Sequence, residues 1–313
     1  EDGSISDIGA IIFDQSGAYF PPSAWFSAEE TKIQSGTKVQ FLNNSQKGSE
    51  NIASYSWDFG DGNTSNEFAP LHTYSKNGKF DVTLTVMDPK GFKSIKSLKK
   101  FIISGTLIPA GNISGEWNKL SSPYIINGNI IVPKNELLEV KPGAEILFTG
   151  YFGIRVEGNL KSIGTEDERI TFSSLDTLNF WDRNNHIDYS TFKTEVNGWN
   201  GIDFTNNNVN STIRYTNISY FRNFNPICSD GASSYYGGAI RLNNNNGFIF
   251  EKCIFKNNNA KGYQWGSSQC HTGACIKAYY SDIIVRDCIF DNNEADHAVA
   301  IYIWKSKNAI IEN

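Results

Sequence analysis

The order of apolar and polar positions divides this chain into two parts. Between residues 22 and 104, short segments alternate apolar and polar residues, most clearly at 38–42, 52–57 and 79–86. Alternation with a period of two predicts strands that bury one face. The turn at 88–91 contains proline and glycine and predicts a hairpin. This part is therefore expected to form an antiparallel β-sandwich.

Two motifs in this segment carry a family resemblance. Trp57-Asp-Phe-Gly-Asp-Gly62 is followed by His72-Thr-Tyr74, and then by Gly78 and the strand 80–86. Together they resemble the PKD domain family. The resemblance implies an immunoglobulin-like sandwich of about seven strands, used as a spacer or interaction module in extracellular proteins, with Trp57 and Tyr74 in its core. It implies no catalysis.

Asp58 and Asp61 lie in the tight turn of the first motif. Carboxylates at such a place either accept hydrogen bonds from the turn or bind calcium. Stabilisation of the turn is the favoured interpretation. We expect no cofactor, and calcium is the one metal that stays open.

From residue 113 onward, apolar segments become shorter and more frequent, and helical periodicity is absent. Turns separate the segments, which are 124–126, 130–132, 137–138, 146–148, 154–156 and 170–172. Many short strands at close spacing predict a solenoid.

A repeat appears in the last hundred residues. Phe248-x-Phe250-x-x-Cys253-x-Phe255-x-Asn-Asn258 recurs 35 residues later as Ile283-x-Val285-x-x-Cys288-x-Phe290-x-Asn-Asn293. An earlier copy begins at Ile213 and a later one at Ala309. An Ile-x-apolar strand precedes each of the four copies, so Ile202, Ile240, Ile276 and Ile301 are expected in one interior column. The repeat resembles the right-handed parallel β-helix of the pectate-lyase-like superfamily and the repeats of outer-membrane adhesins. That architecture serves lyases, hydrolases and adhesins alike.

These patterns predict an all-β chain: an immunoglobulin-like β-sandwich plus a right-handed parallel β-helix solenoid. Residues 1–21 are expected to be a linker or the tail of a preceding β-helix unit, and 22–104 the PKD-like sandwich. Residues 105–112 are expected to be a linker, and 113–313 the β-helix, truncated at its C-terminal end.

The period of two also assigns outward positions in the repeat. One predicted column holds Asp203, Arg241, Lys277 and Tyr302, and the next holds Thr205, Asn243, Tyr279 and Trp304. This strip is either a sugar-binding surface or a solvated sheet face. The inserts 229–236 and 261–269 are expected to stack at one corner and to contact ligand. The candidate ligand-binding residues are Tyr235, Tyr236, Tyr263, Trp265, Tyr279, Trp304, Arg241 and Lys277.

A second outward column is apolar, with Ile249, Ile284 and Ile310, and with Ile254 and Ile289 nearby. Apolar residues on both faces of a strand predict that the outer face is covered. A loop of this chain is the favoured cover, and a continuation of the chain or a partner is the alternative.

The five cysteines fall into two groups. Cys253 and Cys288 are expected to stack as buried thiols. Cys228 and Cys270 lie in equivalent inserts and are the predicted disulfide, with Cys270–Cys275 as the competing pair. No metal site is expected, because the chain lacks paired Cys-x-x-Cys or spaced histidines.

Charge and hydropathy argue against two classes of function. A net charge of −5 and a pI near 5.5 argue against nucleic-acid binding, and no apolar run reaches the roughly 18 residues of a membrane span. The chain begins with Glu1 rather than Met, which favours a processed product or an excised piece.

We therefore expect a non-catalytic segment of a secreted, multi-repeat bacterial cell-surface protein, an adhesin or glycan-binding stalk whose partners are extracellular glycans or other surface proteins. One alternative is a polysaccharide lyase or hydrolase that acts on an acidic glycan, with Lys277, Arg241 and Tyr302 as its catalytic residues. Another is a structural component of an extracellular filament or assembly.

Overall fold

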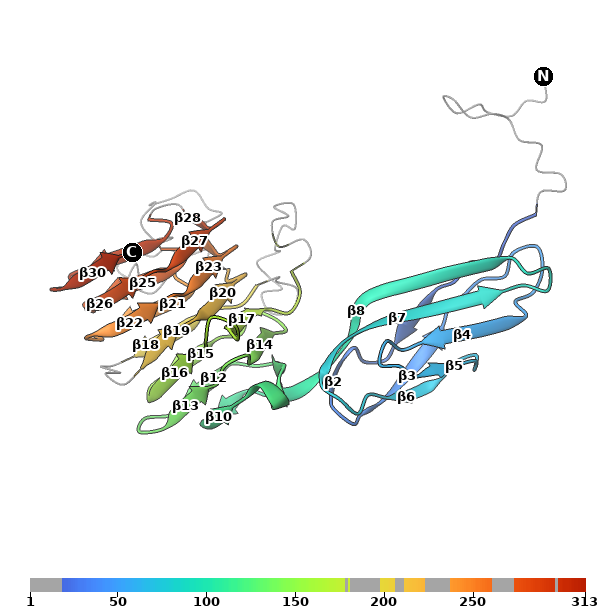
Figure 1. Ribbon diagram of the computed structural model, residues 1–313, viewed down its shortest axis with the longest axis horizontal. Helices are drawn as coiled ribbons and strands as arrows, with labels where there is room; N and C mark the ends of the chain where they lie inside the picture. Colours follow the sequence, from blue (N-terminus) through green and yellow to red (C-terminus); the bar gives the residue numbers. More distant parts are fainter. Residues whose placement is uncertain are drawn as a thin grey trace, which may run out of the picture. The chain divides into compact units, whose positions relative to one another are not determined.

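The computed structural model describes residues 19–177, 180, 198–205, 211–222, 237–260, 273–295 and 298–313. The chain forms two compact units, Glu1–Ser104 and Gly105–Asn313 (Figure 1). The expected sandwich falls in the first unit and the expected solenoid in the second.

In the first unit, strands pair antiparallel in two sheets. One has the order β1-β3-β6 and the other the order β8-β7-β4-β5, with β2 beside β8. The strands are β1 (Phe26–Ala28), β2 (Lys32–Gln34), β3 (Lys38–Asn43), β4 (Ser54–Asp58), β5 (Thr64–Ser65), β6 (Leu71–Thr73), β7 (Gly78–Met87) and β8 (Lys93–Ile108). The predicted antiparallel strands and the 88–91 hairpin are confirmed.

Aromatic rings fill the core of this unit. Trp57 is fully buried, contacts the rings of Phe26 and Phe41, and donates its indole N–H to the carbonyl of Glu67 at 2.9 Å. Tyr74 is also fully buried, and its hydroxyl donates to the carbonyl of Phe59. A buried ring of this size needs a partner for its polar atom, and both rings have one.

The glycine-rich turn is held by its own carboxylates. Asp58 accepts from the N–H of Gly60 at 2.8 Å, and Asp61 accepts from the N–H of Asn63 at 3.1 Å and contacts Nε2 of His72 at 2.8 Å. Only glycine fits at position 60, because φ is +78° and a Cβ there would lie 2.2 Å from the carbonyl oxygen of Asp81. The expectation that these carboxylates stabilise the turn is confirmed.

In the second unit, the strands pair parallel in three sheets that we call A, B and C (Figure 1). Sheet A contains β9 (Gly111–Asn112), β12 (Ile130–Val132), β15 (Ile154–Val156), β18 (Ile202–Thr205), β21 (Ile240–Asn243), β25 (Ile276–Tyr279) and β29 (Ile301–Trp304). Sheet B contains β10 (Gly115–Trp117), β13 (Leu137–Val140), β16 (Asn159–Ile163), β19 (Thr212–Arg214), β22 (Phe248–Glu251), β26 (Ile283–Arg286) and β30 (Ala309–Glu312). Sheet C contains the end of β8, β11 (Tyr124–Ile126), β14 (Glu145–Phe148), β17 (Ile170–Ser174), β20 (Thr216–Ser219), β23 (Ile254–Lys256) and β27 (Ile289–Asp291). The short strands β24 (Asn259–Ala260) and β28 (Glu294–Ala295) pair with each other in parallel, and a 3₁₀ turn, η1, spans Lys119–Ser121.

The predicted interior column is present in sheet A. Ile202 pairs with Ile240, Ile240 with Ile276, and Ile276 with Ile301. The first three are fully buried and Ile301 is half-buried. Parallel sheets that each take one strand from every repeat fit a β-helix.

The segment 105–112 is not a linker, so that expectation is wrong. Residues 106–108 of β8 pair with β11, and Gly111–Asn112 forms β9 and pairs with β12. Both stretches therefore complete the first turn of the parallel sheets. The sequence indicates a linker here although the segment contains Leu107 and Ile108, because its glycines and Pro109 are typical of turns, while the pairing uses its backbone.

At the corners between strands, a residue with left-handed backbone dihedral angles turns the chain. Asn257 and Asn292 take this conformation after β23 and β27, with φ of 57° and 50°. Asn258, the next residue, donates to the carbonyl of Ile218 at 3.0 Å and accepts from the N–H of Phe221 at 3.1 Å. It is fully buried. The asparagine thus satisfies backbone groups of the neighbouring repeat at the corner.

Replacing Asn258 by Ala should lower the free energy of unfolding by about 2–4 kcal/mol, because two buried backbone groups lose their partners. Urea denaturation followed by circular dichroism measures this change. Asn246→Ala is the matched control, since Asn246 is exposed and should change stability little. Equal stabilities of the two variants would contradict the role of the corner.

Asp61→Asn should destabilise the first unit at neutral pH by about 1 kcal/mol and not at acidic pH. Partial burial acts to raise the pKa of Asp61, but hydrogen bonds from His72 and Asn63 outweigh it and hold the pKa below its ordinary value. The ionised carboxylate therefore stabilises the native state fully above the ordinary value of about 4, and this stabilisation disappears as pH falls through the native pKa. Calorimetric melting of the wild type, Asp61→Asn and the exposed control Glu67→Gln across this pH range tests the prediction. A pH-independent difference would refute it.

Candidate functional site

The two outward columns predicted for the repeat lie side by side in sheet A. Asp203, Arg241, Lys277 and Tyr302 are in register, and so are Thr205, Asn243, Tyr279 and Trp304. Neighbouring strands are about 4.8 Å apart, so each column brings residues distant in sequence into contact range. We call this surface the outer strip of sheet A.

The basic residues of the strip have structural partners. Arg241 donates from Nη1 to the carbonyls of Asn200 at 2.7 Å and Gly238 at 3.2 Å. Lys277 is only 2% exposed, and burial, with a contribution from Arg241, lowers its pKa to about 8. Its ammonium lies 5.6 Å from the ring centre of Tyr302. The expectation that Lys277 faces solvent is therefore wrong, because neighbouring side chains and backbone enclose it.

The aromatic residues of the strip form a surface of their own. The rings of Tyr302 and Trp304 are nearly parallel, with an interplanar angle of 3° and centroids 6.4 Å apart. This spacing follows from their positions two residues apart on one face of β29. Trp304 is 46% exposed. Beside it, Tyr279 meets Tyr280 edge to face at 4.5 Å.

Tyr280 was missed by the sequence analysis. It occupies a left-handed corner, with φ of 48°, and its hydroxyl accepts from Nζ of Lys305 at 2.9 Å. The signal was present in the repeat, since Tyr280 and Lys305 occupy the same place after their strands as Asn244. We call Tyr279, Tyr280, Tyr302 and Trp304 the aromatic platform.

Other predicted residues cannot be placed. Tyr235, Tyr236, Tyr263 and Trp265, and the predicted disulfide Cys228–Cys270, lie outside the described residues. Their roles stay predictions.

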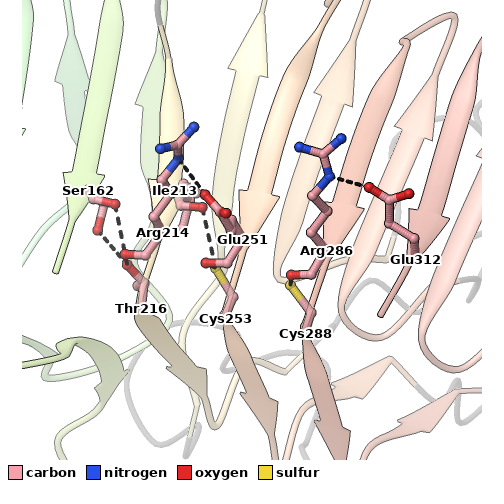
Figure 2. A network of polar contacts seen from close by, with 9 residues as sticks. All are labelled: Ser162, Ile213, Arg214, Thr216, Glu251, Cys253, Arg286, Cys288 and Glu312. Carbon is pink, nitrogen blue, oxygen red and sulfur yellow. Dashed lines mark hydrogen bonds and ion pairs between the residues drawn. The ribbon is translucent and has the colours of Figure 1, made fainter. Parts of the chain in front are cut away.

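A column of small polar side chains lies at the corner between sheets B and C (Figure 2). Ser162 Oγ is 2.9 Å from Thr216 Oγ1, and Thr216 donates to the carbonyl of Arg214 at 2.9 Å. Cys253 and Cys288 occupy the following places, and their thiols donate to the carbonyls of Glu251 at 3.5 Å and Arg286 at 3.3 Å.

Cys253 and Cys288 follow each other in this column as expected, but only Cys253 is buried. Cys253 is fully buried, Cys288 is half-buried, and both are free. Cys275 is free as well, whereas Cys270, its partner in the alternative pairing, lies outside the described residues.

The apolar column of sheet B is only partly exposed. Ile249 and Ile284 are half-buried, as is Ile254 on sheet C. Ile310 is 45% exposed, and Ile289, on sheet C, is 55% exposed. The cover over this column stays a prediction.

The described parts of the chain contain no group of three or more histidine, cysteine, aspartate or glutamate side chains suited to a metal ion. They also contain no helix of the length and apolarity that crossing a membrane requires.

Comparison with known proteins identifies the first unit. The family model described as "PKD domain" matches residues 20–101, in agreement with the motifs and with the antiparallel sheets. Residues 20–101 are a PKD domain.

The relatives match through short segments. The chain is 50% identical over 62 residues to the pre-pro-metalloprotease PrtV of Vibrio cholerae, covering 20% of this chain and 7% of that protein. It is 30% identical over 147 residues to collagenase ColA of Clostridium perfringens, covering 45% of this chain and 12% of that protein. The crystal structure of the PKD1 domain of Vibrio anguillarum Epp is 31% identical, covers 28% of this chain and 99% of that domain, and has a TM-score of 0.25. The chain thus spans about a tenth of the curated relatives' length.

Cys288 should react with an alkylating reagent before the other described thiols. Its hydrogen bond with Cys253 outweighs burial and lowers the pKa of Cys288, whereas burial raises the pKa of Cys253 and Cys275. Peptide mapping after brief exposure to N-ethylmaleimide at neutral pH should show modification of Cys288 at least about tenfold faster. Modification of Cys253 at the same rate as Cys288 would contradict the burial of Cys253. Labelling in urea is the control, because the cysteines should all react once the chain is unfolded.

Proposed function

We propose that this chain is a segment of a secreted bacterial surface protein in which the PKD domain is an accessory spacer and residues 105–313 form a right-handed parallel β-helix that binds a glycan. The secreted setting is supported by the PKD relatives, which are named as a pre-pro-metalloprotease and as collagenases. Collagen is an extracellular substrate, so an enzyme that degrades it acts outside the cell.

The β-helix is supported by the register of the three parallel sheets. Successive repeats place one strand in each sheet, and single left-handed residues join sheet B to sheet C at Tyr215, Lys252 and Asp287. Connections between parallel strands are right-handed in about 98% of cases. The pairing and the short corners together favour a right-handed solenoid.

The observation that carries glycan binding is the parallel pair of Tyr302 and Trp304 rings on the outward face of β29, where Trp304 is exposed and Tyr302 is half-buried. Aromatic faces bind the apolar faces of sugar rings, and polar neighbours bind the hydroxyls. Asn243 and Tyr279 supply such polar groups in the same column. Because the platform is built on strands, its geometry is set before a ligand arrives.

One observation favours the rival lyase. A lysine with a pKa of about 8 is suited to act as a general base near neutral pH. However, Lys277 is 2% exposed, and a base must reach the proton that it abstracts. Binding without catalysis therefore fits the strip better.

Trp304→Ala should weaken binding to the recognised polysaccharide at least about tenfold, or about 1.4 kcal/mol, because one stacking face is lost. Affinity electrophoresis of the whole chain in gels containing β-glucan, xylan, pectin or alginate measures retardation. Trp25→Ala is the matched control, since Trp25 is exposed to a similar extent in the PKD domain. Glycan binding by the aromatic platform would be refuted if no polymer retarded the wild type. It would also be refuted if Trp25→Ala, and not Trp304→Ala, abolished the retardation.

A further inference from the structure

The outward face of sheet B carries a ladder of alternating charge. Arg214, Glu251, Arg286 and Glu312 occupy equivalent positions on β19, β22, β26 and β30. Figure 2 shows their side chains side by side on neighbouring strands. Arg214 Nε lies 3.1 Å from Glu251 Oε2, and Arg286 pairs with Glu312. All four side chains keep between 29% and 49% of their surface in contact with solvent.

An apolar column runs beside this ladder. Ile249, Ile284 and Ile310 are in register two residues earlier on the same strands, and therefore on the same face. Ile310 is 45% exposed, and Ile249 and Ile284 are half-buried. A column of partly exposed isoleucines on a sheet face is typical of a contact surface rather than of a solvated face. We call the two columns together the mixed strip.

We propose that the mixed strip binds a second copy of this chain about a two-fold axis parallel to the strands of sheet B. Such an axis places each column opposite the same column of the second copy and reverses the order of the repeats. Arg214 then faces Glu312 of the second copy, and Glu251 faces its Arg286. The isoleucine columns face each other.

Charge complementarity selects the occupant. A row of four charges of alternating sign, read in reverse, presents the opposite sign at every place, whereas pairing in the same order would oppose like charges. The chain therefore contains its own complement, and a two-fold contact uses the same patch on both copies. The strip is four strands wide, roughly 14 Å, and only two columns of side chains deep. The area that it buries is therefore smaller than the roughly 800 Å² per partner of a standard interface. The dimer is accordingly weak and in rapid exchange.

Sedimentation velocity of the whole chain over a wide range of concentration tests this proposal. The wild type should pass from monomer to dimer, with an association that weakens as salt is added. Ile284→Lys and Arg286→Glu should each weaken the association at least about tenfold. Ile284→Lys buries a charge against the isoleucine column of the second copy. Arg286→Glu places a negative charge opposite Glu251 of the second copy. Trp304→Ala, which alters sheet A, should leave it unchanged, so a failure here is distinct from a failure of glycan binding.

The double variant Glu251→Arg/Arg286→Glu separates the contact between copies from the ladder within one copy. It restores opposite charges across the two-fold axis but places like charges next to each other within the chain. Association should therefore recover relative to Arg286→Glu alone, while circular dichroism shows that all variants keep their strands. The proposal would be overturned if the wild type stayed monomeric or if Ile284→Lys did not weaken the dimer. It would also be overturned if the double variant associated no more strongly than Arg286→Glu alone.

Discussion

The register of the parallel strands is the constraint on which the second unit depends. A slip of one residue would move every interior side chain to the outside, and Ile202, Ile240 and Ile276 would lose their common column. Backbone pairing alone permits such slips. The corners oppose them, because several left-handed residues are followed by a side chain that bonds to backbone of its own or the adjacent repeat, as Asn258 does with Ile218 and Phe221.

The same register organises the outside of the sheets. Once interior positions are aligned, outward positions two residues apart are aligned as well, whatever their chemistry. This alignment brings Tyr279 beside Trp304 on sheet A, and Glu251 beside Arg286 on sheet B. The two candidate surfaces belong to different sheets, so each can be altered by mutation without disturbing the other.

The strands and the interior columns could be predicted from the sequence because a period of two is a local signal, and 124–126, 130–132 and 154–156 were placed correctly. The burial of Lys277 could not be predicted from the sequence. The alternation of apolar and polar residues gives the direction in which a side chain points, but not which groups surround it. The strands in 105–112 were missed because their pairing depends on backbone contacts with β11 and β12. The PKD domain was recognised because its turn requires glycine and aspartate at fixed places.

The thiols show how one corner geometry accepts different chemistry. Thr216, Cys253 and Cys288 hold equivalent places, and each donates to the carbonyl two residues before it. A hydroxyl and a thiol are both small donors, but the thiol loses less on burial because it is less strongly hydrated. The cysteines are therefore explained by packing and by a weak hydrogen bond to the backbone. A disulfide between them would require both side chains to leave these carbonyls and to adopt a dihedral angle that parallel neighbours do not present, so the corner favours the reduced thiols.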